Sequence, residues 1–217
     1  MAYTFAVGDI HGCIDPLNRL LARIEAYAPS GTVVFLGDHV DRGPDSCGVL
    51  ERLIAGPASG FEWICLMGNH EELMCGAYDG RSSRELWLNN GGLETEMSFG
   101  GKVPDAYLEW TGSRPAIHID PHRIFVHAGV STLLPLDRQS RRDLLWLRFS
   151  PDESNDYWGR HVVHGHTPSK SNPVTVGNRT NVDAACVFGG KLACAVFDDA
   201  IAGAPIDFIE VAAAGDA

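Results

Sequence analysis

The chain has 217 residues, of which 45% are hydrophobic, and its formal net charge at pH 7 is −11. A chain of this length can bury one substantial core, so we expect a single domain over residues 1–217. The negative charge argues against a nucleic-acid-binding protein, which needs a basic face to displace counterions from the phosphate backbone.

Strand and helix patterns alternate along the first 70 residues. Continuous apolar runs that end in Gly-containing loops predict buried strands, and apolar residues at helical spacing predict helices. In chain order we predict a strand within 3–12, a helix over 15–28, a strand over 32–38, a helix over 46–56 and a strand over 61–69. Asp15 and Pro16 are expected at the N-cap and first turn of the first helix. The β-α-β-α-β order indicates an α/β fold.

The second half of the chain changes from helical to strand-like patterns. Residues 71–115 are predicted to be largely helical, with NNGG and FGGK as punctuation. Short apolar runs then predict strands within 123–129, 161–166, 172–177, 180–188 and 191–198. The FGGK sequence at 188–191 is a hairpin-turn signal, and the final AAAGDA is expected to fray.

Polar residues follow the predicted strands in five Gly-containing segments: GDIHG, GDHVDRG, GNHE, VHAG and HGHT. In an open α/β sheet, ligands bind beyond the carboxyl ends of the strands, so we expect these loops to meet in one place. Each residue alone has a simpler reading, such as a turn cap for Asp9 or a core histidine for His127. The ordered combination favours a shared site.

The side chains in these segments offer carboxylate oxygen, amide oxygen and imidazole nitrogen, with no thiolate. Such a mixed set suits Mn, Fe or Zn. A carboxylate has two oxygens and can bridge two ions, as in hydrolytic sites whose metals lie roughly 3.5–4 Å apart and activate a hydroxide. An asparagine ligand adds no negative charge, which leaves more positive charge for a phosphate.

The five segments together resemble the signature blocks of the PPP-type metallophosphatases, within the calcineurin-like metallophosphoesterase superfamily. The set spans residues 8–167, and WLNNGG and HGHTP are most similar to the compact bacterial and phage branch, which includes the bacteriophage lambda protein phosphatase. The resemblance implies a metallophosphoesterase-type β-sandwich with flanking helices, whose active site lies in loops at the carboxyl ends of the strands.

The resemblance also implies a binuclear metal centre. Its two divalent ions would be Mn²⁺ in the simplest case, with Fe or Zn as alternatives. The implied ligands are Asp9 and His11 for the first ion, Asp38 as the bridge, and Asn69, His127 and His166 for the second ion.

Four further residues receive roles by the same resemblance. His70 would be the general acid for the leaving oxygen, oriented by Asp41. Arg42 would clamp the phosphate, since a planar guanidinium matches phosphate oxygens better than an ammonium does. In LLWLRF, Arg148 follows Trp146 at the place where this branch has a second arginine. A surface ion pair is the alternative reading for either arginine.

Five other histidines are less easily placed. His39 lies between two proposed site acids, and strand alternation would turn it away from them toward a packing role. His164 is two residues before His166, so it could line the site or belong to the core. His118, His122 and His161 are expected at the surface.

The N-terminal segment has no basic stretch followed by a long apolar one, and no run approaches the roughly 18 apolar residues of a membrane span. We therefore expect a cytoplasmic protein that does not bind membranes. The six cysteines form no CxxC pair, and we expect free thiols packed as small hydrophobic groups.

The leading functional hypothesis is a metal-dependent phosphoprotein phosphatase that acts on Ser/Thr and can extend to phosphotyrosine. The alternative is a symmetrical bis(5'-nucleosyl)-tetraphosphatase, which uses the same metal cage. Asp41 in VDRG, Glu71 after GNH and the short chain favour the phosphatase. A metal-binding scaffold without turnover would predict a damaged catalytic block, and none of the blocks is damaged.

Overall fold

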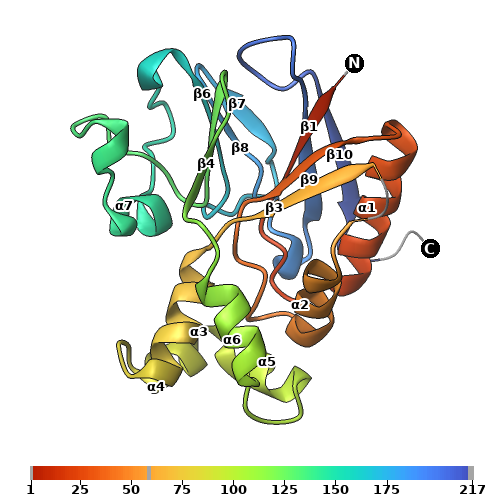
Figure 1. Cartoon of the computed structure of the whole chain (residues 1–217), viewed down its shortest axis with the longest axis vertical. Helices are drawn as coiled ribbons and strands as arrows, with labels where there is room; N and C mark the ends of the chain where they lie inside the picture. The colour runs from red at the N-terminus through yellow and green to blue at the C-terminus, as the bar shows by residue number, and fades with distance from the viewer. Residues whose placement is uncertain (1, 58–59, 215–217) are drawn as a thin grey trace.

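The computed structural model describes residues 2–57 and 60–214 and consists of two five-stranded sheets with helices around them (Figure 1). The two sheets share a buried core. In its centre, the rings of Phe197 from the first sheet and Phe125 from the second lie edge to face, with 6.1 Å between centroids. The predicted α/β sandwich with flanking helices is therefore confirmed, whereas a single domain over 1–217 stays a prediction.

The first sheet has the strand order β10-β9-β1-β2-β3. Its strands are β1 (Tyr3–Val7), β2 (Gly31–Phe35), β3 (Phe61–Cys65), β9 (Lys191–Asp198) and β10 (Asp207–Ala212). Strands β1 to β3 are parallel, and β9 is antiparallel to both β1 and β10. This arrangement places the loops after β1, β2 and β3 at the same edge of the sheet.

Helices α1 (Ile14–Tyr27) and α2 (Ser46–Ala55) connect these parallel strands, which confirms the predicted β-α-β-α-β order. Helix α1 buries Leu17, Leu20 and Ile24 in a core shared with the first sheet. The predicted N-cap at Asp15 is wrong. The chain already turns at Gly12, with φ of 66°, so that Cys13 precedes the first helical residue and Asp15 lies in the first turn.

The second sheet has the strand order β4-β5-β6-β8-β7. Its strands are β4 (Ile117–Ile119), β5 (Arg123–Val126), β6 (His161–His164), β7 (Val174–Val176) and β8 (Arg179–Asn181). The central strands β5, β6 and β8 are parallel. Helix α7 (Arg141–Trp146) and the short 3₁₀ turns η2 (Leu136–Arg138) and η3 (Tyr157–Gly159) lie in the connection between β5 and β6.

The part of the chain that connects β3 of the first sheet to β4 of the second forms a helical lobe, at the bottom of Figure 1. It contains α3 (Asn69–Asp79), α4 (Arg84–Trp87), the π-helical turn η1 (Leu88–Gly92), α5 (Leu93–Ser98) and α6 (Asp105–Gly112). The prediction of helices over 71–115 is confirmed. Trp87 is fully buried in the core of this lobe, together with Leu73 and Met74.

The predicted hairpin at 188–191 is wrong. Strand β8 belongs to the second sheet and β9 to the first, so the chain crosses between the sheets here. The glycine signal reflects a tight turn instead: η4 (Cys186–Phe188) ends at Gly189, with φ of 74°. The strand predicted within 180–188 is correspondingly confined to its first residues.

Strand β10 was not predicted from the sequence. It is an edge strand with only Ile209 and Val211 buried, so it lacks the continuous apolar run that marks the central strands. Of the stretch expected to fray, Ala212 ends this strand, and 215–217 lie outside the described residues. All six cysteines are free, as predicted. No helix in the described residues is long and apolar enough to cross a membrane.

Candidate metal centre

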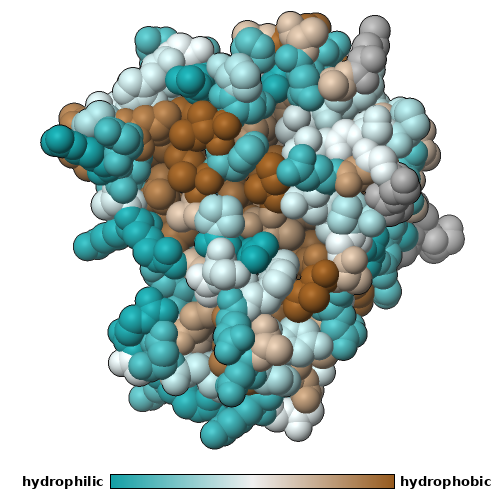
Figure 2. Space-filling model, in the orientation of Figure 1, coloured by the Kyte–Doolittle hydropathy of each residue, from teal (hydrophilic) through white to brown (hydrophobic). Residues whose placement is uncertain are grey.

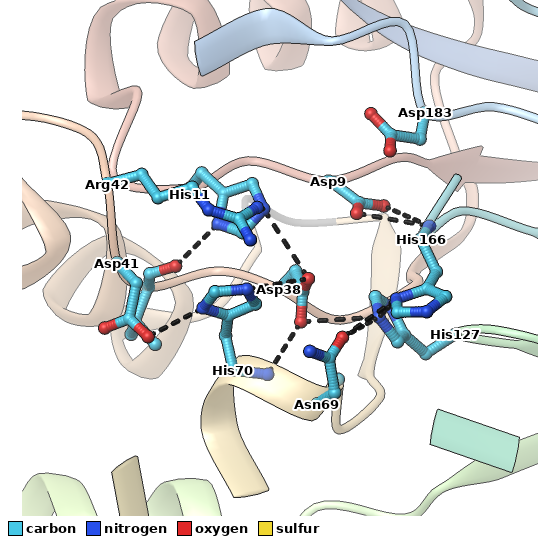
Figure 3. A network of polar contacts seen from close by, with 12 residues as sticks. Asp9, His11, Asp38, Asp41, Arg42, Asn69, His70, His127, His166 and Asp183 are labelled. Carbon is cyan, nitrogen blue, oxygen red and sulfur yellow. Dashed lines mark hydrogen bonds and ion pairs between the residues drawn. The ribbon is translucent and has the colours of Figure 1, made fainter. Parts of the chain in front are cut away.

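The six side chains that the sequence suggests as metal ligands lie together at one edge of the two sheets (Figure 3). They follow the ends of β1, β2 and β3 in the first sheet and of β5 and β6 in the second. None of them is more than 6% exposed. They are Asp9, His11, Asp38, Asn69, His127 and His166.

Asp38 stands between the two halves of this cluster. Its carboxylate Oδ2 is 3.5 Å from Nε2 of His11, whereas Oδ1 is 3.4 Å from Nε2 of His127. Oδ1 also accepts the backbone N–H of His70 at 3.0 Å, at the start of α3. A carboxylate placed in this way can bind a different ion through each oxygen.

The buried carboxylate of Glu71 holds the loop that carries Asp38. It accepts the backbone N–H groups of Asp38 and His39, each at 2.8 Å, and that of Gly68, also at 2.8 Å. Because Gly68 directly precedes Asn69, one carboxylate fixes the backbone at two of the proposed ligands. Four N–H···O bonds to one buried group, including Val40 N–H at 3.2 Å, also satisfy a charge that would otherwise be costly.

Backbone strain is concentrated at this site. Among the described residues, seven other than glycine have a positive φ, and five of these belong to the loops around the cluster. The five are His11, Asp38, Asp41, Arg42 and His166. Such conformations cost free energy and persist where the surrounding structure enforces them, which is common at functional sites.

The second set of donor atoms is closely spaced. Oδ1 of Asn69 is 2.8 Å from Nε2 of His127 and 2.9 Å from Nδ1 of His166, and these two nitrogens are 3.2 Å apart. Ligand atoms that share an ion at about 2.0–2.2 Å are separated by roughly this distance. Nδ1 of His127 donates to the carbonyl of Leu36 at 3.1 Å, so its Nε2 presents a lone pair to the site.

The first proposed set of donor atoms comes from Asp9, His11 and Asp38, and the donor atoms of His11 and Asp38 also lie within 4.8 Å of a ring nitrogen of His70. Nδ1 of His11 donates to the carbonyl of Val40 at 2.8 Å, so that Nε2 presents its lone pair. Both carboxylate oxygens of Asp9 are 3.2 Å from the backbone nitrogen of His166, which links the two halves of the cluster. Two carboxylates and one imidazole fit a divalent ion such as Mn²⁺ or Fe²⁺.

The protonation states of the three imidazoles and of Asp38 suit metal binding. Burial lowers the pKa of His11 and of His127 to about 3. Burial also lowers the pKa of His166 to about 4, and Arg148 adds to this effect. Burial alone would raise the pKa of Asp38, but the surrounding histidines hold it well below its usual range. Neutral imidazoles and an ionised carboxylate are the forms that bind a metal.

His70 and Asp41 form a hydrogen-bonded pair beside the first set. Nδ1 of His70 is 2.7 Å from Oδ2 of Asp41. Burial acts to lower the pKa of His70, but the carboxylates of Asp38 and Asp41 outweigh it and raise that pKa. The pair therefore offers a proton on an imidazole that is fixed by a carboxylate, which is the arrangement a general acid requires.

Arg42 and Arg148 line a pocket of about 320 Å³ that opens onto the cluster. NH1 of Arg42 donates to Nε2 of His11 at 2.7 Å, and the backbone N–H of Arg42 donates to the carbonyl of Gly91 at 3.0 Å. A Cβ at Gly91, where φ is 103°, would lie 2.5 Å from the nitrogen of Arg42, so this contact requires glycine. Arg148 is exposed, with its charge on the His166 side of the pocket.

Three residues of the site were not identified from the sequence. Asp183 follows β8, is 4% exposed and lines the same pocket. Trp87 and Thr95 come from the helical lobe and donate to the carboxylate of Asp41, Trp87 at 3.0 and 3.1 Å and Thr95 at 2.7 Å. The strand-end position of Asp183 could have identified it, whereas no local pattern points to Trp87 or Thr95.

His39 and His164 lie outside the pocket. His39 is fully buried, and its Nδ1 is 3.7 Å from Oε1 of Glu71, in a packing position. His164 is also buried, and its ring packs against Phe149 with 5.0 Å between centroids. It lines a separate pocket of about 320 Å³, which Phe149 and Arg179 also line. The observed packing therefore favours core roles for both side chains.

The expectation that His161 lies at the surface is wrong. The side chain is 2% exposed, and its Nε2 lies 2.8 Å from the hydroxyl of Thr180 on β8. The reason is topological, because β6 is the central strand of the second sheet and both of its faces are covered. Burial lowers the pKa of His161 to about 4. His118 and His122 are half-buried.

Known proteins resemble this chain over most of its length. A family model described as calcineurin-like phosphoesterase matches residues 4–197. Among curated relatives, the serine/threonine-protein phosphatase 1 of Salmonella typhimurium is 29% identical over 214 residues, which cover 89% of this chain and 91% of the relative. The crystal structure of a candidate diadenosine tetraphosphatase aligns with a TM-score of 0.70 and 25% identity, and covers 97% of this chain and 93% of that one.

The asymmetrical bis(5'-nucleosyl)-tetraphosphatase of Oceanobacillus iheyensis is 26% identical over 220 residues, which cover 86% of this chain and 85% of the relative. The symmetrical tetraphosphatases match only in part. The symmetrical bis(5'-nucleosyl)-tetraphosphatase of Janthinobacterium sp. is 32% identical over 131 residues. That match covers 58% of this chain but only 43% of the relative, so the chain spans less than half the length of this protein. The likeness to tetraphosphatases of this kind is therefore a likeness of one portion of the chain.

Proposed function

This chain belongs to the calcineurin-like phosphoesterase family, and we propose that within this family it is a two-metal phosphomonoester hydrolase that acts on phosphorylated Ser/Thr in proteins. The observation that carries the proposal is the placement of Asp38, whose two carboxylate oxygens face two separate histidine groups. When bound, two divalent ions such as Mn²⁺ would neutralise phosphate charge and supply an activated water.

The side chains around the proposed ions have distinct roles in this hydrolysis. Arg42 and Arg148 reach into the pocket and would bind the phosphate oxygens, since guanidinium groups make paired, charge-assisted hydrogen bonds to phosphate. His70 would donate a proton from Nε2 to the leaving oxygen. Asp41 holds the opposite ring nitrogen at 2.7 Å and thereby keeps Nε2 directed toward the site.

A protein substrate is supported by one of the relatives that match over most of both chains, the serine/threonine-protein phosphatase 1. Asp41 in VDRG and Glu71 after GNH also favour this branch. The carboxylate of Glu71 accepts four backbone N–H groups of the loops that carry the proposed ligands, and it therefore holds these loops in place. The proposed activity also extends to phosphotyrosine in the same pocket.

A second candidate function is hydrolysis of a bis(5'-nucleosyl) tetraphosphate, as the names of other relatives suggest. One structural feature favours it. Phe188 is 53% exposed at the pocket, and its ring centre is 5.6 Å from the guanidinium carbon of Arg42. An exposed aromatic ring beside a phosphate-binding arginine can stack on a nucleobase, and such stacking contributes about 1–3 kcal/mol per base in other proteins.

A comparison of three substrates tests these proposals. The purified protein would be assayed with a phosphoserine peptide, p-nitrophenyl phosphate and diadenosine tetraphosphate, each with Mn²⁺ and with a chelator. We expect Mn²⁺-dependent turnover with the highest kcat/KM on the peptide. A higher kcat/KM on the dinucleotide would instead establish the second candidate. Bound metal without turnover of any of the three would indicate a scaffold that lacks catalysis.

A further inference from the structure

Asp183 lies beside the proposed metal centre but is not one of its six ligands. It follows β8 of the second sheet, its side chain is 4% exposed, and it lines the pocket that Asp9 and Asp38 also line. Figure 3 shows its carboxylate next to that of Asp9, on the side of Asp9 away from His70. The two aspartates come from different sheets and are 174 positions apart in the sequence (183 minus 9).

Two glycines allow this close approach. A Cβ at Gly8 would lie 2.6 Å from the carbonyl oxygen of Val182 and 3.3 Å from the nitrogen of Asp183. A Cβ at Gly165 would lie 2.0 Å from Oδ1 of Asp9 and 3.8 Å from the Cβ of Asp183. A side chain at Gly8 would push the two backbones apart, whereas a side chain at Gly165 would displace the carboxylate of Asp9. The close approach at Gly8 is therefore one of backbone to backbone.

Asp183 is held on both sides of its peptide unit. Its backbone N–H donates to Oδ1 of Asn181 at 3.0 Å, and its carbonyl accepts Nδ2 of Asn172 at 2.7 Å. In the side chain, Oδ1 accepts the backbone N–H of Ala185 at 3.1 Å. A carboxylate restrained in this way can fix the orientation of a neighbouring group.

The charges at this point call for a cation. Asp9, Asp38 and Asp183 are three buried carboxylates in one pocket, and Arg42 is the cation that acts on both Asp9 and Asp183. Like charges at short range destabilise one another, and a divalent ion bound beside them removes that repulsion.

We infer that Asp183 is a positioning residue of the metal centre, which orients Asp9 and strengthens binding of the first ion, the one assigned to Asp9 and His11. This inference rests on the proposed two-metal function and extends it to a residue outside the ligand set. Partners that orient a metal ligand typically change metal affinity or activity by about 10–100-fold when they are replaced.

The test compares Mn²⁺ binding by calorimetry, with the bound metal counted after dialysis. Asp183→Asn keeps the shape of the side chain and an oxygen for Ala185 N–H. It should lower the affinity for one Mn²⁺ ion about 10–100-fold, while the affinity for the other ion stays within about threefold of that of the wild type. Asn69→Ala should lower the affinity for the other ion, and the variant with both changes, Asp183→Asn and Asn69→Ala, should lower the affinity for both ions. The control is Asp199→Asn, which removes the same charge at the opposite end of the sheet, where Asp199 accepts the hydroxyl of Thr4.

The outcomes separate this inference from the proposed function. Two ions bound by Asp183→Asn with wild-type affinity, or weakening of the same ion as in Asn69→Ala, would overturn the role of Asp183 alone. Wild-type protein that binds no Mn²⁺ would overturn the two-metal function itself. If Asp183→Asn does not fold, Asp183→Glu keeps the charge but displaces the carboxylate by one methylene. The same selective loss is then expected, and unchanged binding of both ions by Asp183→Glu would also overturn the inference.

Discussion

Asn69 and His70 are adjacent in the sequence, but their side chains face different partners. Oδ1 of Asn69 meets His127 and His166, whereas Nδ1 of His70 meets Asp41. At the level of the residue, this divergence explains why an amide and an imidazole stand side by side at the start of α3. One would serve a metal ion, and the other would serve the leaving group.

Substitutions of the two residues should therefore have different effects. Asn69→Ala should lower metal affinity and recover part of its activity in excess Mn²⁺. His70→Asn should leave the metal content unchanged and reduce kcat on a phosphoserine peptide by roughly 10²–10⁴, the usual contribution of a general acid. The loss should be smaller on p-nitrophenyl phosphate, whose leaving group needs a proton less. Equal losses on both substrates would argue that His70 positions the phosphate instead.

Among the described residues, the guanidinium of Arg148 forms no hydrogen bond or ion pair with another side chain. It lines the pocket, and its charge acts on His166. Loss of a hydrogen bond to a charged group costs about 1.5–3 kcal/mol. We therefore expect Arg148→Ala to reduce kcat/KM roughly 10–100-fold and to weaken inhibition by inorganic phosphate. Arg142→Ala removes an exposed arginine from α7 of the same segment and serves as the matched control. Equal phosphate inhibition of both variants would remove Arg148 from the phosphate site.

At the level of the element, the helical lobe acts on the site through Asp41. Trp87, at the end of α4, and Thr95, in α5, donate to the two oxygens of this carboxylate and thereby fix the acceptor of His70. The sequence predicts that residues 71–115 are helical, because helical spacing and glycine punctuation are local signals. It does not predict these contacts, because the partners are 46 and 54 positions from Asp41 and no short-range pattern relates them.

Trp87→Phe tests this link while it preserves the aromatic volume in the lobe. The variant removes the indole N–H and leaves Asp41 with fewer donors. We expect kcat on the phosphoserine peptide to fall about tenfold, in line with the loss of roughly 1.5 kcal/mol for a hydrogen bond to a charged group. Metal content should not change. Trp110→Phe, in α6 of the same lobe, has no indole contact with Asp41 and provides the comparison.

Strand β6 carries a titratable side chain in the core, since His161 is buried beside Thr180. Burial lowers the pKa of His161 to about 4 in the folded protein, from about 6.5 in the unfolded chain. Between these values the unfolded state binds more protons, so the free energy of unfolding should fall as the pH decreases from 6.5 to 4.

His161→Gln keeps a polar partner for Thr180 and does not titrate. The free energy of unfolding in urea would be measured in chelator between pH 7 and 4.5. For His161→Gln this free energy should depend less steeply on pH than for the wild type, by a slope that corresponds to at most one proton. His118→Gln changes a half-buried histidine on the neighbouring edge of the same sheet and serves as the control. Parallel pH profiles for wild type and His161→Gln would contradict a neutral, buried His161.

At the scale of the whole molecule, the site lies where the two sheets meet. The first sheet supplies Asp9, His11, Asp38 and Asn69, and the second supplies His127 and His166. The strand patterns predict that these six side chains meet, because each follows a recognisable strand and strand ends in a parallel sheet share an edge. Their roles as metal ligands come from the family resemblance. The family resemblance implies a sandwich, but the strand patterns do not show which strand belongs to which sheet. For that reason the tight turn at 188–191 resembles a hairpin in the sequence. The end of a strand marks Asp183, but no sequence pattern relates it to Asp9 across the two sheets.

A centre that joins two sheets should also stabilise the molecule when metal is bound. Ions that bind only the folded state raise the free energy of unfolding by about 2.7 kcal/mol for each site at 100 times its Kd. In a chain of this size, 1 kcal/mol shifts Tm by roughly 2–4 °C, so we expect Mn²⁺ bound at both sites to raise Tm by about 10–20 °C over the chelated protein. Asp38→Asn should lose most of this increment, because Asp38 contacts the donor groups of both sheets. Asp199→Asn should retain it. The measurement is calorimetric or circular dichroism melting across a Mn²⁺ series. A full increment in Asp38→Asn would mean that the two halves of the centre bind their ions independently, without Asp38 as the bridge.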